Sequence, residues 1–260
     1  MLSFLGIHFR NPDKAVYSGS VIDLLQRVGV SEDATRSTLT RMVKRNLLYR
    51  HRRGRKMYFS ITERAAQVLE DGYRRIWETG AVNRDWTGDW TVVTFSMPND
   101  WRSQRHDLRS ELTWKGFGLL QHAVWIAPGD IEVADFVDRL GLTQYVTVMT
   151  ARAKEPTESA HMVRKAFDIQ EIAGRYHEFL RRWDTEQPLP ECPDDLARQL
   201  LLHTDWLQLV RQDPHLPAQH LPTDWPAIRA EKLFRSLAIR YETATRRLAD
   251  EVLDQIRLGG

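Results

Sequence analysis

The spacing of apolar residues near the start of the chain restricts the fold more than any other feature of the sequence. One stripe has the 3.6-residue period of an amphipathic helix and consists of Val21, Leu24, Leu25 and Val28. Gly29 can adopt the left-handed backbone of a helix end, and Ser31 can cap a second helix over residues 32–45. Two helices joined by a short turn that contains a glycine predict a helix-turn-helix.

The residues that follow have the pattern of a β-hairpin. Residues 47–51 and 56–61 are predicted to be short strands, the second with the apolar and aromatic run Met57-Tyr58-Phe59. Arg52-Arg53-Gly54-Arg55 between them has the composition of a tight turn. A long helix is predicted from residue 62 to about residue 79. Residues 1–80 are therefore predicted to form a winged helix-turn-helix DNA-binding domain with a linker helix.

The basic residues of the chain are concentrated in this first part. Residues 1–75 hold 15 Lys and Arg against 7 Asp and Glu, a net charge of +8, whereas the remainder carries a net charge of −6. Residues 36–56 alone hold nine basic side chains and no acidic one. Charge alone fits a solvated basic face equally well, but its combination with the helix-turn-helix spacing and the hairpin favours a DNA-binding surface.

The second predicted helix presents one face to solvent, because its apolar residues occupy the other. Early residues of a recognition helix contact base edges in the major groove, whereas flanking Arg and Lys side chains neutralise phosphates. We therefore expect DNA contacts from Arg36, Ser37 and Thr40 to bases, and from Arg41 and Lys44 to phosphates. The predicted hairpin adds residues for phosphates or the minor groove, namely Arg50, Arg52, Arg53, Arg55 and Lys56.

The remainder of the chain predicts two further domains, so the expected fold class is α+β and multidomain. Six segments have the patterns of strand, helix, strand, strand, helix and strand: 90–97, 101–114, 117–120, 123–126, 130–140 and 145–151. This βαββαβ order predicts a ferredoxin-like domain over residues 86–155. From about residue 156 onward only helices are expected, over 160–183, 194–211 and 227–257, with a proline-punctuated loop at 213–226. Residues 156–260 are thus predicted to form an all-helical C-terminal domain.

Motifs of common enzyme classes are missing from the sequence. There is no Gly-rich phosphate loop, no Gly-x-Ser-x-Gly elbow and no His-Glu-x-x-His metal motif. Ferredoxin-like nucleases of CRISPR adaptation place an aspartate at the end of their first strand, where this chain has Phe95-Ser96-Met97. Without that carboxylate a nuclease interpretation fails. We expect no catalytic residue, no bound metal and no cofactor.

The cellular context is predicted from features of a different kind. The single cysteine, Cys192, excludes a disulfide within one chain and fits a reducing compartment. No window approaches the roughly 18–20 continuous apolar residues of a membrane span, and the first residues lack the features of a signal peptide. The sequence therefore predicts a cytoplasmic protein that does not enter a membrane.

Three separate segments together resemble the PaaX-type repressors of phenylacetic acid degradation operons. The N-terminal segment contains Gly29-Val30-Ser31, Leu39-x-Arg41-Met42-Val43 and Gly54-Arg55-x-x-Tyr58. The central segment contains Trp86-x-Gly88-x-Trp90, Leu112-x-Trp114-x-Gly116-Phe117-Gly118 and Val124-Trp125-Ile126. The C-terminal segment contains Asp213-Pro214-x-Leu216-Pro217 and Leu221-Pro222-x-Asp224-Trp225-Pro226. The resemblance implies a dimeric repressor that is released from its operator by an aryl-CoA thioester.

The chain departs from that family pattern in three places. Thr35 and Thr38 stand where small apolar residues are expected, and Asn46-Leu47 replaces a glycine-tryptophan pair. The N-terminus is also shorter, by a turn or two of helix, than the resemblance implies. The substitutions at Thr35, Thr38 and Asn46-Leu47 keep the side-chain volume similar, so we expect the same fold.

The function predicted from the sequence is that of a homodimeric repressor, which binds an imperfect operator palindrome and responds to an acyl-CoA or similar effector. Candidate effector-binding residues are Arg102, Arg105 and Arg109 for CoA phosphates, with Trp114 and Trp125 near the acyl group. The more ordinary interpretation is that these arginines form a solvated helix face and that the tryptophans belong to the core. Two other functions stay open: a DNA-binding protein without small-molecule input, and a nucleic-acid-processing or CoA-processing enzyme.

Overall fold

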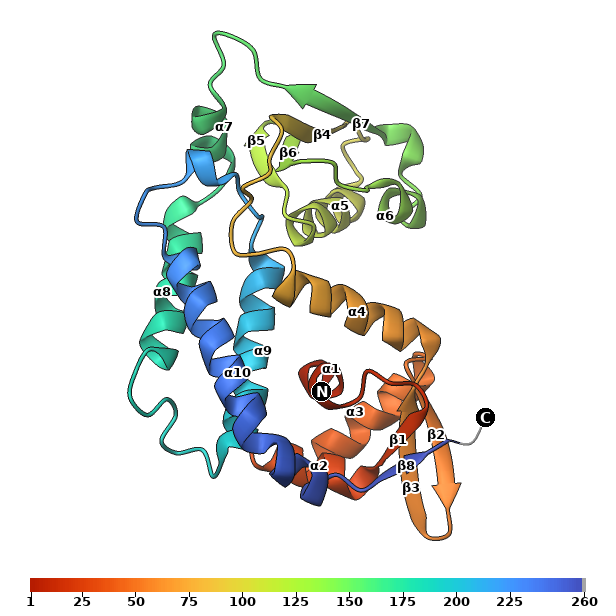
Figure 1. Ribbon diagram of the computed structural model, residues 1–260. Coiled ribbons are helices and arrows are strands. Elements are labelled where there is room, and N and C mark those ends of the chain that lie inside the picture. Colours follow the sequence, from red (N-terminus) through yellow and green to blue (C-terminus); the bar gives the residue numbers. More distant parts are fainter. Residues whose placement is uncertain (259–260) are drawn as a thin grey trace. The chain divides into compact units, whose positions relative to one another are not determined.

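The computed structural model describes residues 1–258, and these residues form two compact units (Figure 1). The first, which we call the N-terminal unit, combines residues 1–79 with residues 178–208 and the chain from residue 230 onward. The second, the central unit, combines residues 80–177 with residues 209–229. Within residues 1–258, no helix has both the length and the apolar character needed to cross a membrane.

The N-terminal unit begins with helices and strands in alternation. Their bounds are α1 Leu2–His8, β1 Lys14–Tyr17, α2 Ser18–Gln26, α3 Glu32–Lys44, β2 Leu48–Arg53, β3 Lys56–Ile61 and α4 Glu63–Trp77. Helix α3 begins where the Ser31 hydroxyl accepts a hydrogen bond from the amide of Ala34, and Thr62 caps α4 in the same way. Gly29 and Asn46 follow α2 and α3 with φ of +80° and +55°, the left-handed backbone that such exits require.

Three long helices follow later in the chain. They are α8 Ile169–Trp183, α9 Asp195–Gln212 and α10 Pro226–Val252, and a shorter helix, α7 Ser159–Ala166, precedes them. The sequence predicts one helix over residues 160–183, but the structure interrupts it between α7 and α8. At this break the Asp168 carboxylate accepts a hydrogen bond from the amide of Glu171 at 2.8 Å, so a new helix starts there.

The sheet of the N-terminal unit contains two strands, β1 and β8, that the sequence pattern does not predict. Its order is β2-β3-β1-β8, and all neighbouring strands are antiparallel. Strand β8, Gln255–Arg257, pairs with one edge of β1, and β3 of the hairpin pairs with the other edge (Figure 1). The prediction of an all-helical C-terminal domain is therefore wrong: α10 ends at Val252, and the chain continues as a strand whose backbone groups bond to β1.

The core of the N-terminal unit joins the beginning of the chain to its end. Phe4, Leu24, Leu39 and Phe59 are buried in one cluster with three residues from later segments, Leu196, Leu200 and Leu253. The cluster therefore holds helices α1 to α3 and the sheet together with the start of α9 and the residue that follows α10. Residues from the two ends of the chain stabilise this unit jointly.

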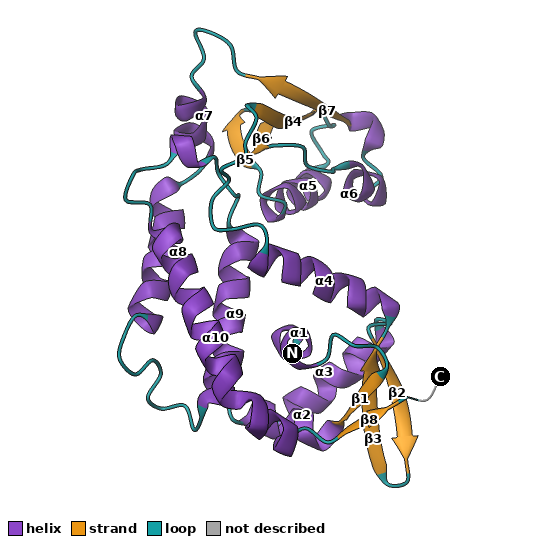
Figure 2. Cartoon of the chain, viewed as in Figure 1, coloured by secondary structure: helices purple, strands orange, loops and turns teal. Residues whose placement is uncertain are grey.

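The central unit is built on a second antiparallel sheet of order β5-β6-β4-β7. In chain order its elements are β4 Asp89–Phe95, α5 Arg102–Trp114, β5 Gly118–Gln121, β6 Val124–Pro128, α6 Ala134–Arg139 and β7 Val146–Arg152. Helices α5 and α6 cover one face of the sheet (Figure 2), where Leu108 and Phe136 pack against Val93 and Trp125. On Gly118 a Cβ would lie 2.4 Å from the carbonyl oxygen of Ala166, so only glycine allows α7 to end this close to β5.

Candidate nucleic-acid interface

The outer face of α3 carries the polar residues that the sequence predicts to be exposed. Ala34, Arg36, Ser37, Thr40, Arg41 and Lys44 are all exposed, whereas Thr35, Leu39 and Met42 face the core. The buried Thr35 hydroxyl donates a hydrogen bond to the carbonyl of Ser31 at 3.1 Å. A threonine is therefore tolerated where a small apolar residue was expected, because its one polar group has a partner.

Arg36 is held by a glutamate of the same helix. Its Nε donates to Glu32 Oε1 at 2.7 Å, and Nη2 lies 2.6 Å from the same oxygen. The two side chains keep 59% and 49% of their surface exposed. The pair is thus a solvent-facing one that orients the guanidinium group, and it leaves the outer edge of that group, around Nη1, directed away from Glu32.

Strands β2 and β3 with the turn between them, residues 48–61, form what we call the basic hairpin. Cross-strand partners share a face of the sheet, so the pairing register shows where each cation points. Arg50 pairs with Phe59, and Arg52 pairs with Met57. These pairs lie on the same face as the pair of Leu48 and Ile61, which is buried in the core. The Arg50 guanidinium lies 6.0 Å from the centre of the Phe59 ring. Arg50 and Arg52 therefore lie on the face of the hairpin that continues the hydrophobic core.

The other cations of the basic hairpin lie elsewhere. Arg53 pairs with Lys56 on the opposite face, and Arg55 stands in the turn beside Gly54, whose φ is +58°. The Nε of Arg52 donates to the Gly54 carbonyl at 3.2 Å. Arginines that look like one set in the sequence are thus divided between two faces and the tip.

Lys56 has a protein partner in the structure. Its Nζ lies 2.7 Å from Asp254 Oδ2 and 4.9 Å from the centre of the Tyr17 ring. The hydrogen bond to the Asp254 carboxylate raises the pKa of Lys56 above its ordinary value. Of the predicted DNA-binding residues, Lys56 is therefore the one whose charge is already compensated by an acid distant in sequence.

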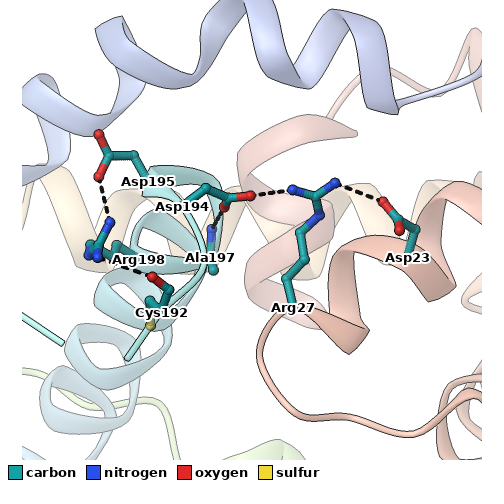
Figure 3. A network of polar contacts seen from close by, with 7 residues as sticks. All are labelled: Asp23, Arg27, Cys192, Asp194, Asp195, Ala197 and Arg198. Atoms are coloured by element: carbon teal, nitrogen blue, oxygen red, sulfur yellow. Dashed lines mark hydrogen bonds and ion pairs between the residues drawn. The ribbon is translucent and has the colours of Figure 1, made fainter. Parts of the chain in front are cut away.

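Helix α2 is connected to the start of α9 by an arginine. Arg27 lies between Asp23, at 3.1 Å, and Asp194 (Figure 3). The Asp194 carboxylate also accepts a hydrogen bond from the amide of Ala197 at 2.9 Å, which caps α9. The Asp194 carboxylate thus caps α9 and also binds Arg27 at the end of α2. Helix α2 is therefore attached to α9, a later part of the chain within the same unit. No local sequence pattern indicates this contact, because its partners are 167 positions apart.

The structure places the five candidate effector-binding residues in different environments. Arg105 donates hydrogen bonds to the carbonyls of Pro98 and Asn99, at 2.7 and 2.5 Å, and so holds the loop before α5. Arg102 and Arg109 are exposed. Trp125 is buried in the core of the central unit, whereas Trp114 is 62% exposed. The two tryptophans therefore do not form a common wall for an acyl group.

The central unit also has a depression that the sequence pattern does not reveal. Its volume is about 830 Å³, and it lies where the end of α7 and the start of α8 meet the short helix η2, Ala218–His220. The residues around it include Arg164, Lys165, Phe167 and His220. These come from two segments about fifty residues apart, so a local motif could not have identified the site.

Comparison with known proteins places the whole of this arrangement in one family. Family models match residues 1–65 as "PaaX-like protein", residues 83–163 as "PaaX protein central Cas2-like domain" and residues 167–251 as "PaaX-like protein C-terminal domain". The transcriptional repressor PaaX of Escherichia coli strain K12 is 26% identical over 230 residues, which cover 84% of this chain and 72% of that protein. An uncharacterized protein of Mycobacterium tuberculosis of known structure is 23% identical, with a TM-score of 0.61 and 90% of each chain covered. That last likeness concerns the fold alone.

Proposed function

Because the chain belongs to the PaaX family, we propose that it is a transcriptional repressor that binds operator DNA through a winged helix-turn-helix. In this proposal α2 and α3 are the two helices and the basic hairpin is the wing. One observation carries it: α3 exposes a polar, basic face free of packing beside a hairpin with four exposed arginines, and residues 36–56, which include most of α3 and of the hairpin, hold no acid. Such a surface suits the regular negative charge of a DNA duplex.

Base reading falls to the first turns of α3 in this proposal. Arg36, Ser37 and Thr40 are the residues that would face base edges, and Glu32 would hold Arg36 in the orientation needed. The Nε of Arg36 donates to Glu32, and Nη2 lies beside the same carboxylate oxygen. The remaining edge of the guanidinium group can then make the two-pronged bond to O6 and N7 of a guanine.

Phosphate contacts are assigned to the remaining cations. Arg41 and Lys44 are exposed further along α3, and Arg50 and Arg52 lie on the core-side face of the basic hairpin. Arg53 and Arg55, nearer the tip, have long side chains that can reach a flanking phosphate or a narrow minor groove. Lys56 is left out, because Asp254 already neutralises its charge.

We propose a homodimer that binds two half-sites. One recognition helix covers too few base pairs for tight, specific binding, and a two-fold protein matches a two-fold operator. Light scattering of the free protein and of its DNA complex measures this stoichiometry. A complex that contains one chain per duplex would contradict the proposal.

The effector is proposed to be an acyl-CoA ester or a similar anionic small molecule. The depression at the α7–α8 junction suits such a ligand, because its surroundings include two cations and the aromatic Phe167 against one acid, Asp168, whose carboxylate already accepts a hydrogen bond from the amide of Glu171. A thermal-shift series with acyl-CoA esters tests binding, since a ligand of the native state raises the melting temperature. The double variant Arg164→Ala, Lys165→Ala should abolish the shift, whereas Arg102→Ala, Arg109→Ala should retain it. The reverse result would move the effector site to α5.

The proposed organisation along the sequence assigns residues 1–80 to DNA binding, 86–155 to a ferredoxin-like domain and 156–260 to a third segment, much of which packs in the N-terminal unit. The order of strands in the central sheet, β5-β6-β4-β7 with antiparallel neighbours, supports the ferredoxin-like assignment.

The experiment that tests the proposed function is selection from a random duplex library, followed by anisotropy titrations over a range of salt concentrations. We expect a recovered site with two-fold symmetry and an affinity that falls steeply as salt rises. Failure to enrich any sequence, together with an affinity that salt does not change, would contradict DNA recognition.

A further inference from the structure

Asp254 connects the end of α10 to three elements of the N-terminal unit, next to the proposed winged helix-turn-helix. Its carboxylate accepts hydrogen bonds from Lys56 Nζ at 2.7 Å and from the Tyr58 hydroxyl at 3.2 Å, both on β3. Its carbonyl accepts a hydrogen bond from the amide of Tyr17 at 2.9 Å, and its amide donates to the Ser20 hydroxyl at 3.0 Å. A single residue therefore contacts β1, α2 and β3 at once.

The chain on either side of Asp254 is anchored as well. Leu253 is 5% exposed and belongs to the core of the N-terminal unit. Strand β8 pairs with β1 at three positions, and the amide of Leu258 donates to the Asp13 carbonyl at 2.8 Å. Asp254 is thus held in place by its neighbours, so it can serve as a fixed support for the side chains that bind it.

The basic hairpin needs such a support at the point where it leaves the sheet. Within residues 1–258, β1 pairs with β3 only at Phe59 and Tyr58, so the outer part of the hairpin extends beyond this neighbour. A two-stranded ribbon without a third strand is only marginally stable in water. The bond from Lys56 to Asp254 occurs just past the last paired residue, on the face opposite Arg50 and Arg52.

We propose that Asp254 is a positioning residue for DNA binding, which fixes the direction of the basic hairpin so that its arginines reach the phosphates beside α3. Residues 253–258 then contribute to DNA binding by supporting the basic hairpin. In this account Lys56 binds Asp254 and does not contact DNA. This inference rests on the proposed function. It assigns a role to a residue that lies about 200 positions from the hairpin.

The first test compares Asp254→Ala with the wild-type chain in anisotropy titrations on the selected duplex. We expect operator affinity to fall by about tenfold and the log–log salt slope to decrease by about 1 per subunit, because misdirected arginines lose phosphate contacts. An unchanged or higher affinity with a steeper slope would overturn the inference. In that case Asp254 would only mask Lys56, and its removal would free a cation for DNA.

A double-mutant cycle separates positioning from a general loss of stability. If Asp254 directs the hairpin, Arg52→Ala should cost clearly less affinity in the Asp254→Ala background than in the wild type. Arg36→Ala on α3 is the matched control and should cost the same in both backgrounds. Equal costs for Arg52→Ala in both backgrounds would overturn the inference. All titrations are made below the melting transition of each variant, and Asp254→Asn replaces Asp254→Ala if the latter does not fold.

Hydrogen exchange of the free protein tests the support without any DNA. We expect Asp254→Ala to lower the protection of β3 amides near Lys56 and Tyr58, while α3 amides stay as in the wild type. Unchanged protection in β3 would overturn the inference. If the wild-type chain does not bind DNA, the proposed function fails, and this exchange result still shows whether Asp254 supports the hairpin.

Discussion

Helices α3 and α5 are a matched pair with different surroundings. Each is 13 residues long, and each carries three Lys or Arg and two Asp or Glu. In α3 both acids, Glu32 and Asp33, stand in the first turn, so the rest of the helix is purely basic. In α5 the acids Asp107 and Glu111 lie beyond the first turn of the helix, on either side of Arg109.

Each helix has one engaged arginine, and the surroundings of the helices differ. On α5, Arg105 donates to carbonyls of the preceding loop, Arg102 and Arg109 are exposed, and Glu111 lies 3.5 Å from Arg139 of α6. On α3, Arg36 is paired with Glu32, Arg41 and Lys44 form no ion pair within the described residues, and the neighbouring basic hairpin adds further cations. Charge counts alone would rank the two helices equally. The order of charges along each helix and the neighbouring elements separate a surface suited to DNA from an ordinary solvated face.

The largest expected effect compares Arg36→Ala on α3 with Arg102→Ala on α5. Loss of a bidentate contact to guanine should cost about 1–3 kcal/mol per half-site and relax the base preference at one position. Arg102→Ala should leave affinity and preference unchanged. Anisotropy titrations on the selected duplex and on single-base variants measure both. Equal losses from the two substitutions would remove the distinction between the helices.

Arg52→Ala should have a smaller effect on DNA binding than Arg36→Ala. Its comparison with Lys56→Met tests the division of the basic hairpin into two faces. Removal of one phosphate contact should reduce the log–log salt slope by about 1 per subunit, on specific and non-specific duplexes alike. Lys56→Met removes no phosphate contact in this account but breaks the bond to Asp254, so it should lower the slope by no more than Asp254→Ala does. A larger decrease for Lys56→Met than for Asp254→Ala would show that Lys56 itself, on the opposite face of the hairpin, meets DNA.

The smallest effect concerns stability instead of binding. Arg105→Ala removes hydrogen bonds to two loop carbonyls and should lower the free energy of unfolding by about 1 kcal/mol. Arg109→Ala, on the same helix, is the control and should leave stability unchanged. Urea denaturation followed by tryptophan fluorescence measures both variants. If Arg105→Ala instead weakens DNA binding of the folded protein with no loss of stability, α5 belongs to the interface.

Much of the N-terminal architecture could be predicted because its signals are local. The span of α3 follows from Ser31 as cap and an apolar stripe, and β3 follows from a compact aromatic run. The exposed face of α3 follows from the same periodicity. The division of the hairpin arginines was also accessible, since alternation in a strand puts Arg50 and Arg52 on one face and Arg53 on the other.

Other features depend on partners far away in the chain. Strands β1 and β8 have four and three residues, too few to show a period, and each is a strand because the other strands of the sheet supply hydrogen bonds. The contacts of Asp254 with Lys56 and of Asp194 with Arg27 have no local signal either. All of these features depend on residues far apart in the sequence. The sequence pattern therefore predicts a helix over the residues that form β8.

Arginine labelling of the full-length protein, with and without bound duplex, tests the difference between α3 and α5 most directly. Phenylglyoxal modifies accessible guanidinium groups, and mass spectrometry locates each modified residue. We expect bound operator to protect Arg36, Arg41, Arg50 and Arg52, while Arg102 and Arg109 react equally in both states. Protection of Arg102 and Arg109, with Arg36 and Arg41 still reactive in the complex, would contradict the assignment of α3 as the DNA-reading surface.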